Sequence, residues 1–117
     1  MGIGYAKKIL AIAVSLFSFS ILNADENGEA LFLANCAECH QPDGQGIPNI
    51  YPALDGNEVV NGSGVDVALV LRIGRGEMPS FKDSLTSAEV TAIINYVRNA
   101  WSNSGEEVSE ETIANLQ

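Results

Sequence analysis

The sequence contains very few of the side chains that most often bind metals. Its 117 residues include one histidine, two cysteines and two methionines, one of which is Met1. One histidine cannot supply two imidazoles to a single site. Two cysteines and one histidine also fall short of the four protein ligands of a structural zinc site. All three nevertheless lie within five positions, in the stretch NCAECHQPDGQG at 35–46, which indicates one concentrated site.

Basic side chains are scarce as well. Six Lys and Arg residues stand against 15 Asp and Glu residues, which gives a formal net charge of −9 at pH 7. This acidity argues against binding to nucleic acid or to anionic membrane surfaces. It favours protein partners that present a basic docking surface.

The first 24 residues have the order of a cleaved secretory signal peptide. Lys7 and Lys8 precede the apolar run 9–22, and Ala24 is the expected residue before the cut. The alternative is an uncleaved membrane anchor, although the run is shorter than the roughly 20 residues of a spanning helix. Cleavage predicts a periplasmic protein without stable membrane insertion. Four basic residues would then remain against 15 acidic ones, a balance of −11.

Helical patterns occupy three segments of the remaining chain. We expect helices over 26–40, 65–73 and 86–101 from their good helix formers and their apolar spacing. The third is the clearest, because Thr86 and Glu89 form a T-x-x-E capping box ahead of an apolar stripe.

The composition changes between and after these helices. Residues 41–64 are rich in Gly, Pro, Asn and Asp, so we expect a long loop, and such loops are usually functional. Residues 103–117 form a polar, acidic tail with room for a short helix from Ser109. No strand pattern and no internal repeat occurs. The sequence therefore predicts one small all-α domain over 25–102.

The motif C-x-x-C-H at 36–40 predicts covalent attachment of a c-type haem. Cys36 and Cys39 lie three residues apart, on the same side of a helical turn, so each thiol can form a thioether with one vinyl group. His40 follows directly and can reach the iron. Two alternatives remain, a redox disulfide and part of a zinc site. The first usually occurs in a βαβ context, and the second needs a fourth ligand.

Met78 is the natural second axial ligand of such an iron. It is the only methionine besides Met1, and it lies in the Gly-rich turn GRGEMPSF, before Pro79. With His40 already used, no second histidine is available, and methionine is a known haem ligand. The alternative is an ordinary core methionine.

Taken in order, these motifs resemble a class I cytochrome c, specifically a small bacterial monohaem protein. The resemblance rests on GEALFLANCAECHQPDGQG, YPALDGN, GRGEMPSF and LTSAEVTAIINYVRNAW, and it covers about 28–101. It implies an all-α fold of about four helices around one covalently bound haem c, with the first and last helices crossing.

The resemblance also implies roles for particular residues. At the helix crossing, Gly28 and Phe32 would meet Ile93 and Tyr96. The Pro52 carbonyl would accept a hydrogen bond from His40 Nδ1, with Pro48 as a rival, and Leu54 would pack on the haem. Other side chains that could line the haem or reach its propionates, or else have ordinary core or surface roles, are Tyr51, Arg72, Arg75, Phe81 and Trp101.

The expected function is that of an electron carrier rather than an enzyme, with no catalytic residues. His40 and Met78 would ligate the iron. The protein would carry single electrons in the periplasm between a dehydrogenase or quinol-oxidising complex and a terminal acceptor. Alternatives are a haem subunit of a larger membrane dehydrogenase or oxidase complex and, with less support because no distal histidine exists, a gas-sensing or peroxidase-type haem protein.

Overall fold

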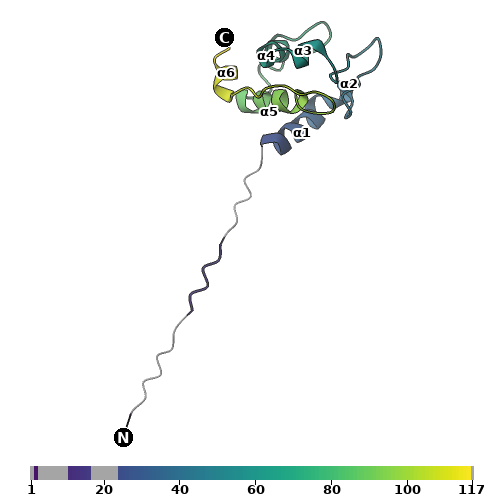
Figure 1. Cartoon of the computed structure of the whole chain (residues 1–117). Helices are drawn as coiled ribbons and strands as arrows, with labels where there is room; N and C mark the ends of the chain where they lie inside the picture. The colour runs from purple at the N-terminus through teal and green to yellow at the C-terminus, as the bar shows by residue number, and fades with distance from the viewer. Residues whose placement is uncertain (1, 3–10, 17–23, 117) are drawn as a thin grey trace.

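A computed structural model describes residue 2, residues 11–16 and residues 24–116 (Figure 1). The predicted signal peptide falls largely outside these residues. The described part contains helices and no strand, which confirms the all-α class. The helices are α1 (Ala24–Asn35), α2 (Ala37–His40), α3 (Glu58–Asn61), α4 (Gly64–Ile73), α5 (Ser87–Val97) and α6 (Glu110–Ala114).

Helices α1 and α5 pack across each other and form the centre of the domain (Figure 1). Gly28 makes this approach possible, because a Cβ atom there would lie 2.4 Å from the Ala92 carbonyl oxygen and 2.9 Å from Tyr96 Cβ. Phe32 is fully buried, with its ring centroid 5.4 Å from that of Tyr96. The close contact expected of Gly28 and Phe32 with the last long helix is therefore present.

The predicted helix over 26–40 is two helices with a break at Cys36. Cys36 has φ −123° and ψ −33°, which departs from helical geometry, and α2 begins at the next residue. The backbone still bonds through the break, since Cys36 N donates to Phe32 O at 2.8 Å and His40 N donates to Cys36 O at 2.9 Å.

The predicted loop over 41–64 contains the short helix α3. Asn57 caps it, because its side chain accepts hydrogen bonds from the backbone N–H groups of Val59 and Val60. Ser63 caps α4 in the same way. Asp66 lies in the first turn of α4 and does not cap the helix.

Helix α5 begins as predicted, with both hydrogen bonds of the Thr86–Glu89 capping box formed. Its end differs from the prediction, because the helix stops at Val97 rather than at Trp101. Trp101 has φ +55°, a conformation that no α-helix continues through. Its ring still reaches the α1–α5 contact, with centroids 5.5 Å from Phe32.

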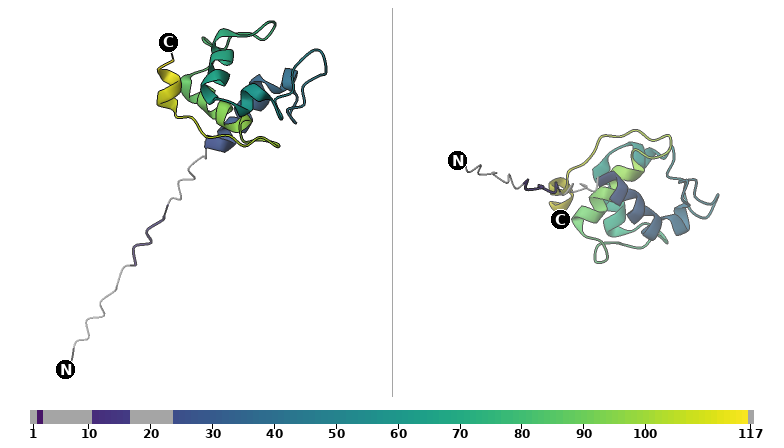
Figure 2. Two further views of the ribbon diagram at one scale, coloured as in Figure 1. Left: turned by 45° about the horizontal axis from the view of Figure 1, so that its top comes forward. Right: turned by 90° about the horizontal axis from the view of Figure 1, so that it is seen from below.

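The polar C-terminal segment returns to the domain and packs on it. Ser109 caps the short helix α6, and Ile113 on that helix is buried. Helix α6 contacts both α4 and α5, beside which it lies in Figure 2. The acidic residues of the segment stay exposed, namely Glu106, Glu107, Glu110 and Glu111.

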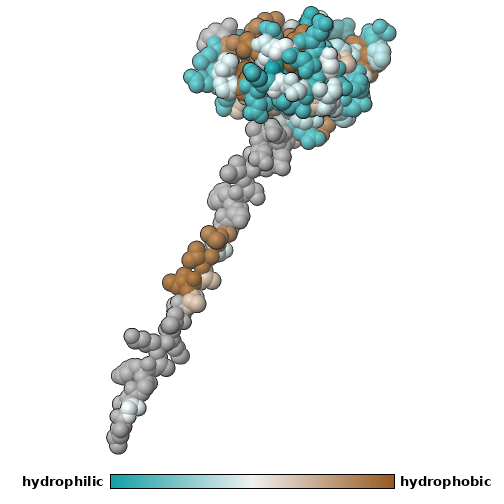
Figure 3. All heavy atoms as spheres, viewed as in Figure 1, coloured by the Kyte–Doolittle hydropathy of each residue, from teal (hydrophilic) through white to brown (hydrophobic). Residues whose placement is uncertain are grey.

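The face of the domain seen in Figure 3 is mainly hydrophilic, as the acidic composition requires. Ile12, Val14 and Leu16 of the N-terminal stretch are highly exposed. None of the helices in the described part is both long enough and apolar enough to span a bilayer.

Candidate haem site

The C-x-x-C-H motif lies in the turn where α1 ends and α2 begins. Cys36 is buried, Cys39 is half-buried, and both are free thiols. His40 is the last residue of α2 and is 7% exposed. One short stretch of backbone thus holds two thiols and one imidazole against the core.

The properties of these cysteines do not favour a redox disulfide. Burial, with a smaller contribution from Cys39, raises the pKa of the Cys36 thiol to about 11. Redox-active cysteines instead depend on a lowered pKa that populates the thiolate. A zinc site gains no support either, because in the part of the chain that the structure describes no cluster of His, Cys, Asp and Glu is arranged to hold a metal ion.

The imidazole of His40 is held by the loop that follows it. Its Nδ1 atom lies 2.9 Å from the Pro52 carbonyl oxygen. This is the contact that the resemblance assigns to Pro52, and Pro48 does not make it. Since Nδ1 is engaged as a donor, Nε2 is the ring nitrogen that remains for a metal. The hydrogen bond therefore fixes both the tautomer and the orientation of the ring.

Met78 lies in a second loop, between α4 and α5. The loop begins at Gly74, and Arg75 and Met78 pair through reciprocal backbone hydrogen bonds of 3.1 and 3.0 Å. Phe81 N donates to Leu71 O at 2.7 Å, which returns the chain to α4. Met78 is half-buried and packs against the hydrophobic core.

Two of the other candidates lie close to the motif or to the core beside it. Leu54 is half-buried against the core. The pKa of Tyr51 is raised, first of all by the neighbouring Cys39 thiol, so the phenol lies beside the cysteine motif.

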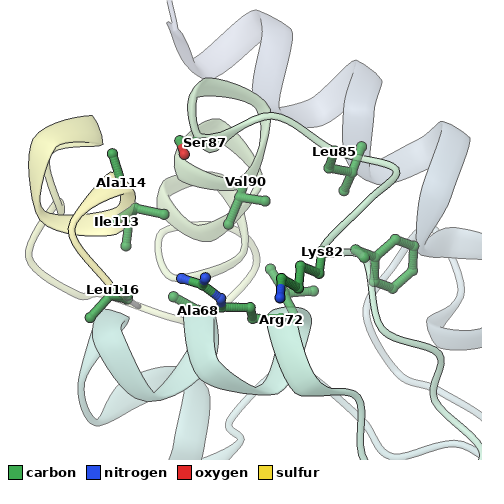
Figure 4. Close-up of a pocket in the computed structure, with 11 residues that line it drawn as sticks. Ala68, Arg72, Lys82, Leu85, Ser87, Val90, Ile113, Ala114 and Leu116 are labelled. Atoms are coloured by element: carbon green, nitrogen blue, oxygen red, sulfur yellow. The ribbon is translucent and has the colours of Figure 1, made fainter.

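Arg72 and Phe81 line a different cavity (Figure 4). This pocket of about 210 Å³ lies between α4, α5 and α6, and Arg72 and Lys82 extend into it. None of the cysteines, His40 or Met78 lines it. It is therefore not the haem site.

Two buried polar residues near the end of α5 were not anticipated from the sequence. Arg98 is 4% exposed and donates from Nη1 to the carbonyl oxygens of Val60 and Gly62. Asn103 is 6% exposed and bonds to the loop after His40. Arg98 lies within the predicted helix over 86–101 and Asn103 in the polar tail, and both residue types are usually exposed, so no signal in the sequence marked them as buried.

The fold and the site together define a c-type cytochrome. The family model described as "Cytochrome C oxidase, cbb3-type, subunit III" matches residues 23–97, and the chain belongs to this cytochrome c family. The family carries covalently bound haem c with iron. The residues present fit that group, because two free thiols three positions apart precede a histidine whose Nδ1 is already engaged.

Among known proteins, the chain is similar to cytochrome c-552 of Thermus thermophilus, with 32% identity over 111 residues that cover 81% of this chain and 72% of that protein. It is also similar to the cytochrome c subunit of alcohol dehydrogenase (quinone) of Gluconobacter oxydans, with 32% identity over 99 residues and 72% of this chain. That match covers only 21% of the subunit, so the chain spans about a fifth of its length.

Among solved structures, cytochrome CL of Methylophaga aminisulfidivorans aligns with a TM-score of 0.62 and 27% identity, over 84% of this chain and 69% of that one. The relatives thus include cytochromes named as such and a cytochrome c subunit of a dehydrogenase.

Proposed function

We propose that this protein is a periplasmic single-electron carrier whose haem is attached through Cys36 and Cys39 and ligated by His40 and Met78. The observation that carries the proposal is the hydrogen bond between His40 Nδ1 and the Pro52 carbonyl oxygen. An ordinary buried histidine needs no fixed tautomer, whereas a metal ligand does, because only the unprotonated nitrogen can bind.

Each residue of the site has a defined task. Haem iron, when bound, supplies one-electron redox chemistry. Cys36, which belongs to the core cluster, and Cys39 would hold the haem through two thioethers. Pro52 orients His40. Met78 would supply a thioether ligand, and such a ligand raises the reduction potential relative to a second histidine.

We expect the protein to carry electrons rather than to catalyse a reaction, because its own ligands would close the coordination sphere of the iron. A catalytic haem needs an open position and nearby acid–base groups. His40 is the only histidine of the sequence, so it leaves none for that second purpose. Met78, packed against the core, would occupy the position that a substrate or gas needs.

A second arrangement has the same chemistry and a permanent partner. The similarity to the cytochrome c subunit of alcohol dehydrogenase (quinone) and to a fructose dehydrogenase cytochrome subunit favours a dehydrogenase as electron donor. In either arrangement, the acidic balance suits a partner with a basic docking surface. Affinity purification from periplasmic and membrane fractions, with and without 0.5 M salt (about a 4 Å screening length), distinguishes a transient partner from a tightly held subunit.

The decisive experiment is Met78→Ala in the haem-loaded protein. The variant is expected to keep its covalent haem, lose the thioether–iron absorption band, fall in reduction potential and bind carbon monoxide readily. The matched control is Ile73→Ala, which removes an exposed side chain just before the same loop and should change none of these. Rapid carbon monoxide binding by the wild type, with no spectral change in Met78→Ala, would refute the proposed ligation.

Export is tested separately. N-terminal sequencing of the haem-containing protein is expected to show cleavage near Ala24. A membrane-bound form that retains Met1 would contradict the assignment to the soluble periplasm.

A further inference from the structure

The segment that follows α5 carries a buried amide with a complete set of hydrogen bonds. Asn103 Nδ2 donates to Leu54 O at 2.9 Å and to Val97 O at 2.8 Å. Its Oδ1 accepts from Gly56 N at 2.9 Å and from Asn61 Nδ2 at 2.9 Å. An amide side chain has two donor hydrogens and two acceptor lone pairs, so all four are used. No other uncharged side chain of this size reproduces the set.

The two residues before Asn103 bind the same loop. The ring of Trp101 covers Gly44, where an added Cβ would lie 2.6 Å from ring atoms, and Trp101 Nε1 donates to Pro42 O at 3.3 Å. Ser102 donates to Asp55 through both its backbone N–H and its hydroxyl. Residues 101–103 thus contact the loop 41–57, here named the histidine loop, at its start and at its end.

The contacts inside the histidine loop lead from these points to His40. Leu54 N donates to Gly44 O at 2.7 Å, so the two ends held by residues 101–103 also hold each other. Gly46 N donates to His40 O at 2.8 Å. Pro52, whose carbonyl accepts from His40 Nδ1, lies two residues before Leu54. Movement of the Leu54 backbone therefore moves the acceptor of the histidine ring.

We propose that residues 101–103, and Asn103 above all, act as positioning residues that hold the Pro52 carbonyl against His40 Nδ1. This inference rests on the proposed role of His40 as iron ligand. Nothing in the resemblance to cytochromes assigned a role to Asn103, which stands in the segment beyond the last expected helix. The physical reason is that a hydrogen bond to a ligand histidine is only as stable as the backbone that carries its acceptor.

The test measures the His40 Nδ1–H bond directly. In the reduced, haem-loaded, ¹⁵N-labelled protein, the exchange rate of this ring N–H with solvent reports how often the bond to Pro52 opens. We expect Asn103→Ala to raise this rate at least tenfold. A change of this size corresponds to the loss of on the order of one to two hydrogen bonds that hold the loop. The backbone amides of Ile93 and Ile94 in α5 should keep their exchange rates within about twofold after correction for global stability. The control is Asn115→Ala, an exposed amide after α6, which should change neither.

A second pair of variants keeps the inference testable if Asn103→Ala does not fold. Trp101→Phe keeps an aromatic ring over Gly44 and removes the donor to Pro42, so a rise of about threefold is expected. Asn103→Asp keeps the acceptor atoms and removes both donors, so its effect should approach that of Asn103→Ala.

The outcomes separate this inference from the function on which it rests. Unchanged ring N–H exchange in Trp101→Phe and in the folded Asn103 variants, with intact axial ligation, would overturn the positioning role alone. A uniform rise across α5 amides would also overturn it, because Asn103 would then act only on global stability. A wild-type spectrum without histidine ligation would instead refute the proposed function.

Discussion

The two loops that hold the candidate iron ligands are built differently. The histidine loop, 41–57, is bonded to residues that lie far along the chain, with separations of 47 residues for Gly56 to Asn103 and 59 for Pro42 to Trp101. The methionine loop, 74–80, is bonded to its neighbours. Its backbone pairs Arg75 with Met78, and its Ser80 hydroxyl donates to Arg72 O.

Because of this difference, we expect the two loops to differ in their stability against local opening. Bonds between neighbours in sequence can open by the movement of one short segment, whereas the bonds of the histidine loop open only if the loop leaves the end of α5. The histidine loop should therefore keep its structure until the whole domain unfolds. The methionine side should be the one that opens first under stress, and the predictions below test this contrast.

The largest expected effect is on the free energy of unfolding, when one methyl group is added to each loop. Gly44 and Gly76 have φ values of +69° and +59°, but a Cβ at Gly44 meets the Trp101 ring whereas a Cβ at Gly76 meets open space. Gly76→Ala should lower the free energy of unfolding by about 1 kcal/mol, from backbone strain. Gly44→Ala should cost about 3 kcal/mol, because overpacking adds to the strain. Urea unfolding of both haem-loaded variants measures the pair, and equal losses would contradict the contrast.

The next effect is the order in which the two sides open in denaturant. We expect the thioether–iron band to disappear at a urea concentration at least about 0.5 M below the midpoint of helix loss, from a local difference of about 1 kcal/mol. Absorbance and far-ultraviolet circular dichroism on one sample measure both. Coincident transitions would show that the methionine loop is as firmly held as the histidine loop.

A smaller effect concerns acid stability on the histidine side. Hydrogen bonds, first of all that from Ser102, lower the pKa of Asp55. Ionised Asp55 therefore stabilises the fold above the ordinary aspartate pKa of about 3.9, and this contribution is lost as pH falls through the lower, folded value. Asp55→Asn should flatten the dependence of unfolding free energy on pH in that acidic window. Asp83→Asn, at an exposed position, is the control and should leave the slope in place.

The smallest effect is on docking, where the loops differ in charge. The histidine loop carries Asp43 and Asp55 without a basic residue, whereas the methionine loop carries Arg75 beside Glu77. Toward a basic partner, Asp43→Asn should slow electron transfer and Arg75→Gln should speed it, each by less than about fivefold. Added salt should slow the wild type, since exposed charges are screened within about 8 Å at physiological ionic strength. Stopped-flow rates across a salt series would measure both, and a rate that rises with salt would indicate an acidic partner.

Much of this protein was predictable from local sequence. The capping box at Thr86 and Glu89 and the apolar spacing of α5 depend only on residues three or four positions apart. The C-x-x-C-H motif is equally local. Such short-range patterns can be recognised without knowing how the rest of the chain folds. The all-α class, the haem and the cytochrome family were therefore predicted correctly.

Other features were decided by the tertiary structure. The break at Cys36, the end of α5 at Val97 and the short helix α3 all depart from the pattern of the sequence. Propensity is a weak prior that packing overrides at such points. The cap at Asn57 was present in the sequence, but it lies within a stretch whose Gly and Pro content indicated a loop.

The sequence by itself determined which residues could bind a haem, because a single histidine and two cysteines leave no other choice. Only the tertiary structure decided how the histidine is held. The resemblance assigned this role to Pro52 and left Pro48 as a rival, and the fold brings the carbonyl of Pro52 to His40. Asn103 reads as part of a polar tail, yet the fold buries it and uses every hydrogen bond it can make. The physical reason is that a buried amide is tolerated only where distant backbone groups converge on it, and that convergence is a property of the folded chain.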